Sequence, residues 1–183
     1  FKLRPDDIVS NHAPLHFDLS IFDIFATIMS GGTIILIPPD VSLFPYNLAS
    51  LIAKSKINVW YSVPSILVKM VLYGKLEQLD FSNLRLVLFA GEVFPTKYLK
   101  KLTKIIPHAL FYNLYGPTET NVCTYYKVDK DNVQDPLPIG KACPYNSLVL
   151  LSNSKIINLE NDQTNFETDV IEGELCVQGP NVM

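Results

Sequence analysis

The eight residues 113–120 combine an amide, an aromatic ring, a Gly-Pro pair, a hydroxyl and a carboxylate. Asn113 can read the edge of a nucleotide base, and the ring of Tyr115 can stack on that base. Thr118 can hold a phosphate oxygen, and Glu119 can hold Mg²⁺, which prefers oxygen ligands and often bridges to phosphates. The alternative is a polar loop with a type I or type II turn at its Gly-Pro pair. So many polar groups in so short a stretch weaken that alternative.

A second carboxylate stands at the start of a very apolar helical stretch. Asp18 lies within residues 16–20, which read HFDLS. It either caps the helix by accepting hydrogen bonds from free N–H groups, or it points into a cleft and binds an ammonium group. Spacing alone favours the cap.

Gly91 and Glu92 follow an expected strand over residues 84–89. Ligands of open α/β sheets lie beyond the carboxyl ends of the strands, and a glycine there permits close approach of the backbone. An ordinary turn from strand to helix explains the pair equally well.

Helical and strand-like spacing alternate up to residue 121. Continuous apolar strands between amphipathic helices predict a parallel sheet covered on both faces, so the expected fold class is α/β. The expected strands are 33–37, which reads as buried, 58–62, 84–89 and 109–113. The expected helices are 21–29, one around 48–52, and two that begin at Pro64 and Pro95.

After residue 121 the pattern changes to short strands separated by turns. These predict a smaller antiparallel or mixed sheet, and the polar, acidic stretch 152–172 predicts a hairpin and a surface loop. We therefore expect two portions of one domain, an α/β portion over 1–121 and a β-rich portion over 122–183. The expected strands are 122–128, 147–151, 156–157 and 174–178.

Composition excludes several classes of protein. Of the 183 residues, 48% are hydrophobic and 18% are charged, which is ample apolar surface for a folded domain. A net charge of −3 argues against a nucleic-acid partner. No apolar run reaches the about 18 residues that a membrane span needs, so we expect no membrane partner. The three cysteines lack CxxC spacing, which fits a reducing cytosol and a cytoplasmic location.

Three short motifs resemble those of the adenylate-forming, AMP-binding enzymes. Residues 113–119 read NLYGPTE and are similar to the signature NxYGPTE, while residues 17–20 read FDLS and residues 173–175 read GEL. Their order and spacing also fit, and the resemblance covers essentially the whole chain. Within this superfamily the sequence resembles amino-acid adenylation domains of nonribosomal peptide synthetases, above all L-prolyl adenylating enzymes and D-alanine–carrier-protein ligases.

The resemblance implies part of a large N-terminal domain and a two-step reaction. A carboxylate attacks the α-phosphate of Mg·ATP, and the phosphopantetheine thiol of a carrier protein then takes the acyl group. Tyr115 would stack on adenine with Asn113 at its edge, Thr118 would contact the α-phosphate, and Glu119 would help to hold Mg²⁺. The catalytic residues implied are thus Thr118 and Glu119. The implied nucleotide-binding residues are Gly91, Glu92, Asn113, Leu114, Tyr115, Gly116 and Thr118.

The resemblance also implies a pocket for an α-amino acid, whose amino group would pair with Asp18. Apart from Asp18 and the Tyr61 hydroxyl the implied lining is apolar, so a charged side chain would be buried there without a partner. We expect a small or medium apolar amino acid, with L-proline the best candidate. Ala90 stands where D-alanine ligases have cysteine. The implied pocket residues are Asp18, Leu19, Phe22, Tyr61, Leu88, Ala90, Leu114, Val122 and Cys123.

The sequence begins at Phe1 and stops at Met183, directly after a strand-like run, which suggests an internal piece of a longer protein. The family's phosphate loop, its ribose-binding aspartate and its lysine-bearing C-terminal domain have no counterpart here. We therefore expect this piece alone to be inactive. The alternatives are a D-alanine–carrier-protein ligase, another acid–thiol ligase such as an acyl-CoA ligase, or a non-catalytic remnant.

Overall fold

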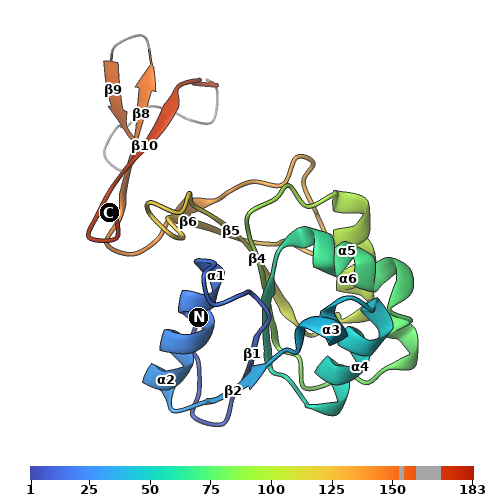
Figure 1. Cartoon of the computed structure of the whole chain (residues 1–183). Coiled ribbons are helices and arrows are strands. Elements are labelled where there is room, and N and C mark those ends of the chain that lie inside the picture. The colour runs from blue at the N-terminus through green and yellow to red at the C-terminus, as the bar shows by residue number, and fades with distance from the viewer. Residues whose placement is uncertain (153–154, 160–169) are drawn as a thin grey trace.

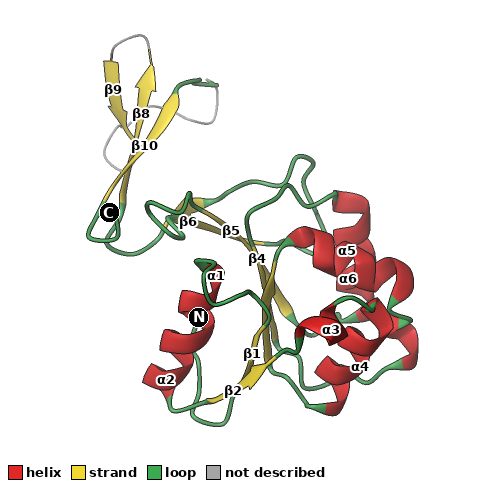
Figure 2. Cartoon of the chain, in the orientation of Figure 1, coloured by secondary structure: helices red, strands yellow, loops and turns green. Residues whose placement is uncertain are grey.

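A seven-stranded sheet forms the body of the structure, a computed structural model that describes residues 1–152, 155–159 and 170–183. The strand order is β2-β1-β3-β4-β5-β6-β7 (Figure 1 and Figure 2). The first five strands in this order are parallel, whereas β6 and β7 are antiparallel, so the expected α/β fold is confirmed. The strands are β1 (Ile8–Asn11), β2 (Thr33–Leu36), β3 (Val59–Ser62), β4 (Leu86–Phe89), β5 (Leu110–Tyr115), β6 (Thr124–Lys127) and β7 (Lys141–Ala142).

Helices cover both faces of this sheet, and the four expected helices are present (Figure 1). The helix expected over 21–29 forms in three pieces, which end at Gly31 in the left-handed conformation (φ 74°). No helix of the described residues is long and apolar enough to cross a membrane. One face carries α1 (Leu19–Ile21), the π-helical turn η1 (Phe22–Ala26) and α2 (Thr27–Ser30). The other carries α3 (Pro39–Ser42), α4 (Pro45–Lys54), α5 (Pro64–Tyr73), η2 (Leu76–Gln78) and α6 (Thr96–Ile105).

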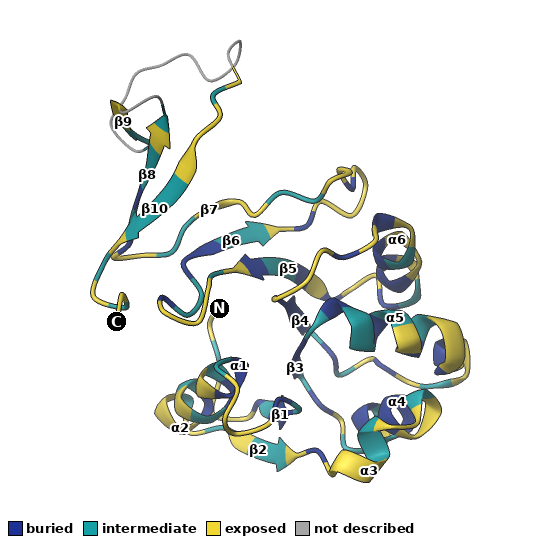
Figure 3. Ribbon diagram, turned by 45° about the horizontal axis from the view of Figure 1, so that its top comes forward, coloured by how far each residue is buried: buried dark blue, intermediate teal, exposed yellow. Residues whose placement is uncertain are grey.

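The parallel strands divide the interior into two cores. Successive side chains of a strand point to opposite faces, so Trp60 joins the core under α4, α5 and α6, whereas Val59 and Tyr61 join the core under α1 and η1. Strands β3 and β4 are buried along their whole length, as the dark blue ribbons of Figure 3 show. Both strands were expected from their continuous apolar runs.

Two features at the first edge of the sheet differ from expectation. The strand expected over 33–37 forms as β2, but the prediction that it is buried is wrong. Strand β2 pairs only with β1, and its side chains are exposed or half-buried. Strand β1 was not expected at all. Its second half is Ser10 and Asn11, two polar residues that are nonetheless buried, so the sequence lacks the apolar run of a parallel strand.

The chain after residue 121 contributes to both sheets. Strand β6, expected as part of a smaller sheet, pairs with β5 and extends the larger one. A three-stranded antiparallel sheet of order β10-β8-β9 contains β8 (Ser147–Ser152), β9 (Lys155–Asn158) and β10 (Glu174–Gln178), and it projects from the body (Figure 1). The expected hairpin is thus confirmed, while residues 153–154 and 160–169 of the expected loop lie outside the described residues. The division of the domain at residue 121 stays a prediction.

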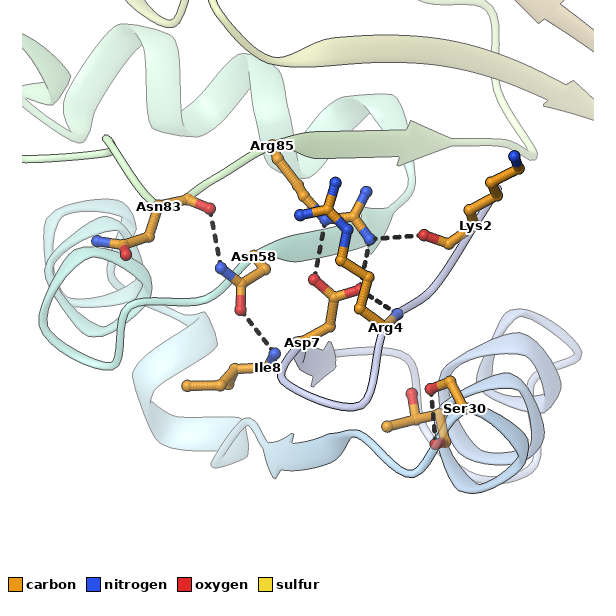
Figure 4. A network of polar contacts seen from close by, with 9 residues as sticks. Lys2, Arg4, Asp7, Ile8, Ser30, Asn58, Asn83 and Arg85 are labelled. Atoms are coloured by element: carbon orange, nitrogen blue, oxygen red, sulfur yellow. Dashed lines mark hydrogen bonds and ion pairs between the residues drawn. The ribbon is translucent and has the colours of Figure 1, made fainter.

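An ion pair ties the N-terminal segment to the sheet at the amino end of β4 (Figure 4). Arg85 donates from Nε to Oδ1 of Asp7 at 2.8 Å, and from Nη2 to Oδ2 of Asp7 and to the Lys2 carbonyl. Burial acts to raise the pKa of Asp7. The Arg85 hydrogen bond, the Arg4 backbone N–H and the charges of both arginines outweigh it and hold that pKa below 3.8.

Asp7→Asn should lower the free energy of unfolding by about 2 kcal/mol near pH 7, since hydrogen bonds to charged groups contribute about 1.5–3 kcal/mol. Because the folded-state pKa is depressed, the wild-type contribution is present above the unfolded pKa and is lost as pH falls through the folded one. Urea unfolding near pH 7 and near pH 3 measures the difference. The exposed neighbour Asp6, changed to Asn, is the control and should shift stability by less than about 0.5 kcal/mol. A wild-type advantage that does not shrink in acid would contradict this account.

Candidate functional site

The carboxyl ends of the parallel strands bring the three polar segments of the sequence to one edge of the sheet. The segment with Asp18 follows β1, Gly91 and Glu92 follow β4, and residues 116–120 follow β5. The segments also touch directly, because Asn121 donates from Nδ2 to the Asp18 carbonyl at 3.4 Å. Residues about a hundred positions apart in the sequence therefore share one surface.

A cavity of about 450 Å³ lies between the ends of β4 and β5. Six of the seven residues expected to bind nucleotide line it, and Thr118 does not. Leu137 and Ile139 of its apolar lining come from a stretch that the sequence did not single out. The expected residues that line the cavity are Gly91, Glu92, Asn113, Leu114, Tyr115 and Gly116. The additional ones are Val93, Phe94, Pro117, Leu137 and Ile139.

Hydrogen bonds hold the polar groups of this cavity in place. The Glu92 carboxylate accepts from the Ser65 backbone N–H at 2.9 Å and from its hydroxyl at 3.2 Å, at the N-terminus of α5, where a negative charge is favoured. Asn113 donates from Nδ2 to the Pro138 carbonyl at 2.8 Å, which fixes the direction of its amide. The ring of Tyr115 is 42% exposed and is therefore available for stacking.

The loop after β5 doubles back on itself and leaves no room for a side chain at Gly116. A Cβ built there would lie 1.7 Å from the Asn121 carbonyl oxygen. The Cys123 backbone N–H donates to the Tyr115 carbonyl at 2.8 Å and closes the loop. Thr118 and Glu119 are exposed at its tip, where a ligand can reach both side chains.

A second cavity of about 380 Å³ brings Asp18 and Thr118 together, lined also by His16, Phe17 and Asn121 among others. Asp18 does occupy the N-cap position of α1, but its side chain makes no capping hydrogen bond. The prediction that the Asp18 carboxylate caps the helix by accepting hydrogen bonds from its free N–H groups is therefore wrong. The half-buried Asp18 instead lines a cavity that Thr118 of the loop after β5 also lines.

Most of the expected amino-acid pocket forms one apolar cluster beneath Asp18. Phe22 meets Tyr61 edge-on, with ring centroids 5.8 Å apart. Tyr61 is buried, and burial first, then the charges of Asp23 and Asp18, raise the pKa of its hydroxyl. The expected residues in this cluster are Leu19, Phe22, Tyr61, Leu88, Ala90, Leu114 and Val122.

Cys123 lies outside that apolar cluster. Its Sγ donates to the Tyr115 carbonyl at 3.4 Å, and burial raises the pKa of its thiol. The Cys123 thiol therefore helps to close the loop after β5. Its expected contact with the substrate stays a prediction.

Sequence reasoning missed Asp23, the neighbour of Phe22. It is fully buried, and its Oδ2 accepts a hydrogen bond from Asn11 Nδ2 at 3.2 Å. Burial raises the pKa of Asp23 to about 8, although the Asn11 hydrogen bond opposes the rise. The one sequence signal for Asp23 was that an acidic residue interrupts the apolar helical run over 21–29. Helical spacing alone does not show whether this residue faces the core or the solvent.

No cluster of three or more His, Cys, Asp or Glu side chains that could hold a metal ion occurs within the described residues. Glu119 offers a single exposed carboxylate. That donor fits Mg²⁺, which is usually held by one or two carboxylates together with substrate phosphates and water. It does not fit a metal that needs a full protein cage.

Two glycine variants should differ in their effect on stability. Gly91→Ala places a left-handed residue (φ +88°) in open space, since its Cβ would meet only Val63 at 3.6 Å, and should cost about 1–2 kcal/mol. Gly116→Ala collides with backbone and should cost at least about twice as much. Thermal unfolding of both variants measures the difference, and equal shifts in Tm would refute the steric argument.

Comparison with known proteins places these observations in a family. Residues 1–183 match the family described as AMP-binding enzyme. Over 186 residues the chain is 40% identical to an L-proline–[L-prolyl-carrier protein] ligase of Pseudomonas fluorescens, and the match covers 100% of this chain and 35% of that protein. It is 31% identical over 185 residues to a D-alanine–D-alanyl carrier protein ligase of Bacillus cytotoxicus, again over 100% of this chain and 35% of that protein.

A solved structure agrees with these sequence matches. The Vibrio cholerae adenylation domain AlmE, in complex with glycyl-adenosine-5′-phosphate, superposes with a TM-score of 0.74 and 27% identity, over 85% of this chain and 29% of that one. The chain spans 35% of the length of both curated relatives described above. Because the family match extends over all of its residues, the chain belongs to the AMP-binding enzyme family.

Proposed function

We propose that this chain is part of an enzyme that activates an amino acid as aminoacyl-AMP and transfers it to the phosphopantetheine thiol of a carrier protein. The observation that carries the proposal is the second cavity, which is lined by both the half-buried Asp18 and Thr118. A carboxylate suits the ammonium group of an amino acid, and a hydroxyl suits a phosphate oxygen. The ligase names of the relatives support the same reaction.

The first cavity would take the nucleotide. Tyr115, exposed at the end of β5, can stack on adenine, while Asn113 presents its amide at the base edge. Gly91, with its positive φ and open surroundings, lets the backbone lie close to the ligand. Glu92, held by Ser65, would shape the wall and not act on the reacting atoms.

Activation then requires the amino acid and the α-phosphate to meet between the two cavities. A carboxylate oxygen of the amino acid attacks the α-phosphorus, the bond to the bridging oxygen breaks, and pyrophosphate leaves. Thr118 would donate its hydroxyl to an α-phosphate oxygen, and Asp18 would orient the substrate through its ammonium group. Such placement converts an encounter of two substrates into a reaction within one complex.

Glu119 would hold Mg²⁺, which when bound supplies positive charge to the phosphates. The exposed position of Glu119 next to Thr118 is compatible with that role. In the second half-reaction the carrier thiol attacks the carbonyl carbon of the adenylate, and AMP leaves. This step needs access for the thiol and no further nucleophile from the described residues.

L-proline is the amino acid that we propose. The cluster beneath Asp18 is apolar apart from the Tyr61 hydroxyl, so a charged side chain would cost several kcal/mol to bury there. A secondary ammonium still pairs with a carboxylate, and the Tyr61 ring can close over a small ring. The second candidate is D-alanine, which the 31% identity to a D-alanine ligase supports.

The substrate is tested by amino-acid-dependent ATP–pyrophosphate exchange, measured on the complete protein that contains this chain. L-proline should give the dominant signal in a panel with D-alanine, L-alanine and L-valine. A dominant D-alanine signal would replace the substrate but keep the reaction. The absence of exchange with every amino acid would overturn the proposed function.

Asp18→Asn should raise the KM for the amino acid at least about thirtyfold, because truncating one partner of a buried charge pair costs about 2 kcal/mol or more. The KM for ATP should change little, since in this proposal Asp18 pairs with the amino acid and not with the nucleotide. Asp40→Asn, an exposed carboxylate of α3, is the matched control and should behave like the wild type. Unchanged amino-acid activation in Asp18→Asn would favour another acid substrate that carries no ammonium group.

A further inference from the structure

A buried carboxyl group that the proposed chemistry does not use lies beside the apolar cluster. Asp23 is 0% exposed, and it lies in the π-helical turn η1. Its Oδ2 accepts one hydrogen bond, and its Oδ1 has no partner within the described residues. Because a buried polar atom without a partner costs stability, its presence here calls for an explanation beyond packing.

The partner of Asp23 connects three parts of the site. Asn11 ends strand β1, and its Nδ2 donates to Asp23 at 3.2 Å and to the Ala13 carbonyl at 3.3 Å. Ala13 belongs to the loop that runs from β1 toward Asp18 and is itself part of the apolar cluster. One amide group therefore ties the helix to both the strand and the loop.

The turn that carries Asp23 also carries a wall of the expected pocket. Phe22 directly precedes Asp23 and meets the Tyr61 ring at 90°. Thr27, one turn on, donates its hydroxyl to the Asp23 carbonyl at 2.6 Å. π-helical turns occur frequently at functional sites, and in this one Asp23 contacts Asn11 while Phe22 contacts Tyr61.

Asp18, Asp23 and Tyr61 interact electrostatically in one desolvated region. The charges of Asp23 and Asp18 both act to raise the pKa of the Tyr61 hydroxyl, which lies unpartnered between apolar side chains. Burial raises the pKa of Asp23 to about 8. The contact with Asn11 needs only an acceptor oxygen at Asp23, which an amide side chain also supplies.

We propose that Asp23 is a positioning residue for the amino-acid pocket. Through Asn11 it fixes η1 on the sheet and thereby sets where Asp18 and Phe22 stand relative to Tyr61. It touches neither substrate nor nucleotide. The inference rests on the proposed function, because it assigns a residue to the pocket of that same reaction.

The test is steady-state ATP–pyrophosphate exchange on the complete protein, with Asn11→Ala, Asp23→Ala and the double variant. Each single variant should raise the KM for the amino acid at least about fivefold, which corresponds to the loss of one buried hydrogen bond. The KM for ATP should stay within about twofold. The double variant should be no worse than the poorer single variant, since both remove the same contact.

Asp23→Asn supplies the rescue, because its Oδ1 can still accept from Asn11, and its KM for the amino acid should return to within about twofold of wild type. Thr27→Ala removes a neighbouring buried hydrogen bond of the same helix and should leave the KM for the amino acid unchanged. Together, Asp23→Asn and Thr27→Ala distinguish a positioning role of Asp23 from a general loss of protein stability. If Asp23→Ala does not fold, Asn11→Ala and Asp23→Asn decide the question alone.

The outcomes are distinguishable. Exchange by the wild type with a KM for the amino acid that neither Asn11→Ala nor Asp23→Ala alters would overturn the positioning role alone. A rise of both KM values together, or in Thr27→Ala as well, would overturn it in favour of a general structural role. No amino-acid-dependent exchange by the wild type would overturn the proposed function, and this inference with it.

Discussion

The parallel pairing of β1, β3, β4 and β5 is the constraint on which the rest of this structure depends. Its register sets Val59 beside Val9 and beside Leu86, and sets Phe89 beside Asn113. Parallel strands end at a common edge, so the loops after them have to emerge side by side. Both candidate cavities are consequences of that edge, although the loops that line them are far apart in the sequence.

The same pairing decides which side chains serve stability and which serve the site. Along β3, Trp60 points into the large core, where its Nε1 donates to Ser62 at 2.9 Å. Tyr61, the next residue, points into the smaller core beneath Asp18. A shift of one residue in register would exchange the two rings and put the indole into the expected pocket. The large apolar core thus fixes the register that the site requires.

The sequence predicted those parts of the fold whose signals are local. Strands β3 and β4 are continuous apolar runs, and α5 begins at a proline, so all three were identified. Membership of the AMP-binding family was predicted from three motifs and is confirmed by the match over the whole chain. The loop after β5 was found because its residue types are unusual together.

What the sequence could not predict depends on distant partners. Strand β1 is held by neighbours on both sides, and its buried Ser10 and Asn11 look like loop residues when read alone. The edge position of β2 follows from strand order, which no local pattern encodes. Asp23 escaped notice because its significance lies in the Asn11 contact, which joins two elements.

The region beneath Asp18 also contains buried polar atoms that lower the stability of the fold. Among the described residues, the region beneath Asp18 holds two buried atoms without partners, the Tyr61 hydroxyl and Asp23 Oδ1, and His12 Nε2 beside Trp60 is another such atom. Each such atom costs about 1–3 kcal/mol, a large fraction of the 5–15 kcal/mol that stabilises a typical domain. A packing-only region would be expected to replace both groups with apolar ones. Two such groups lie together beneath Asp18, which is the pattern expected where local stability is given up to keep polar groups available for a ligand.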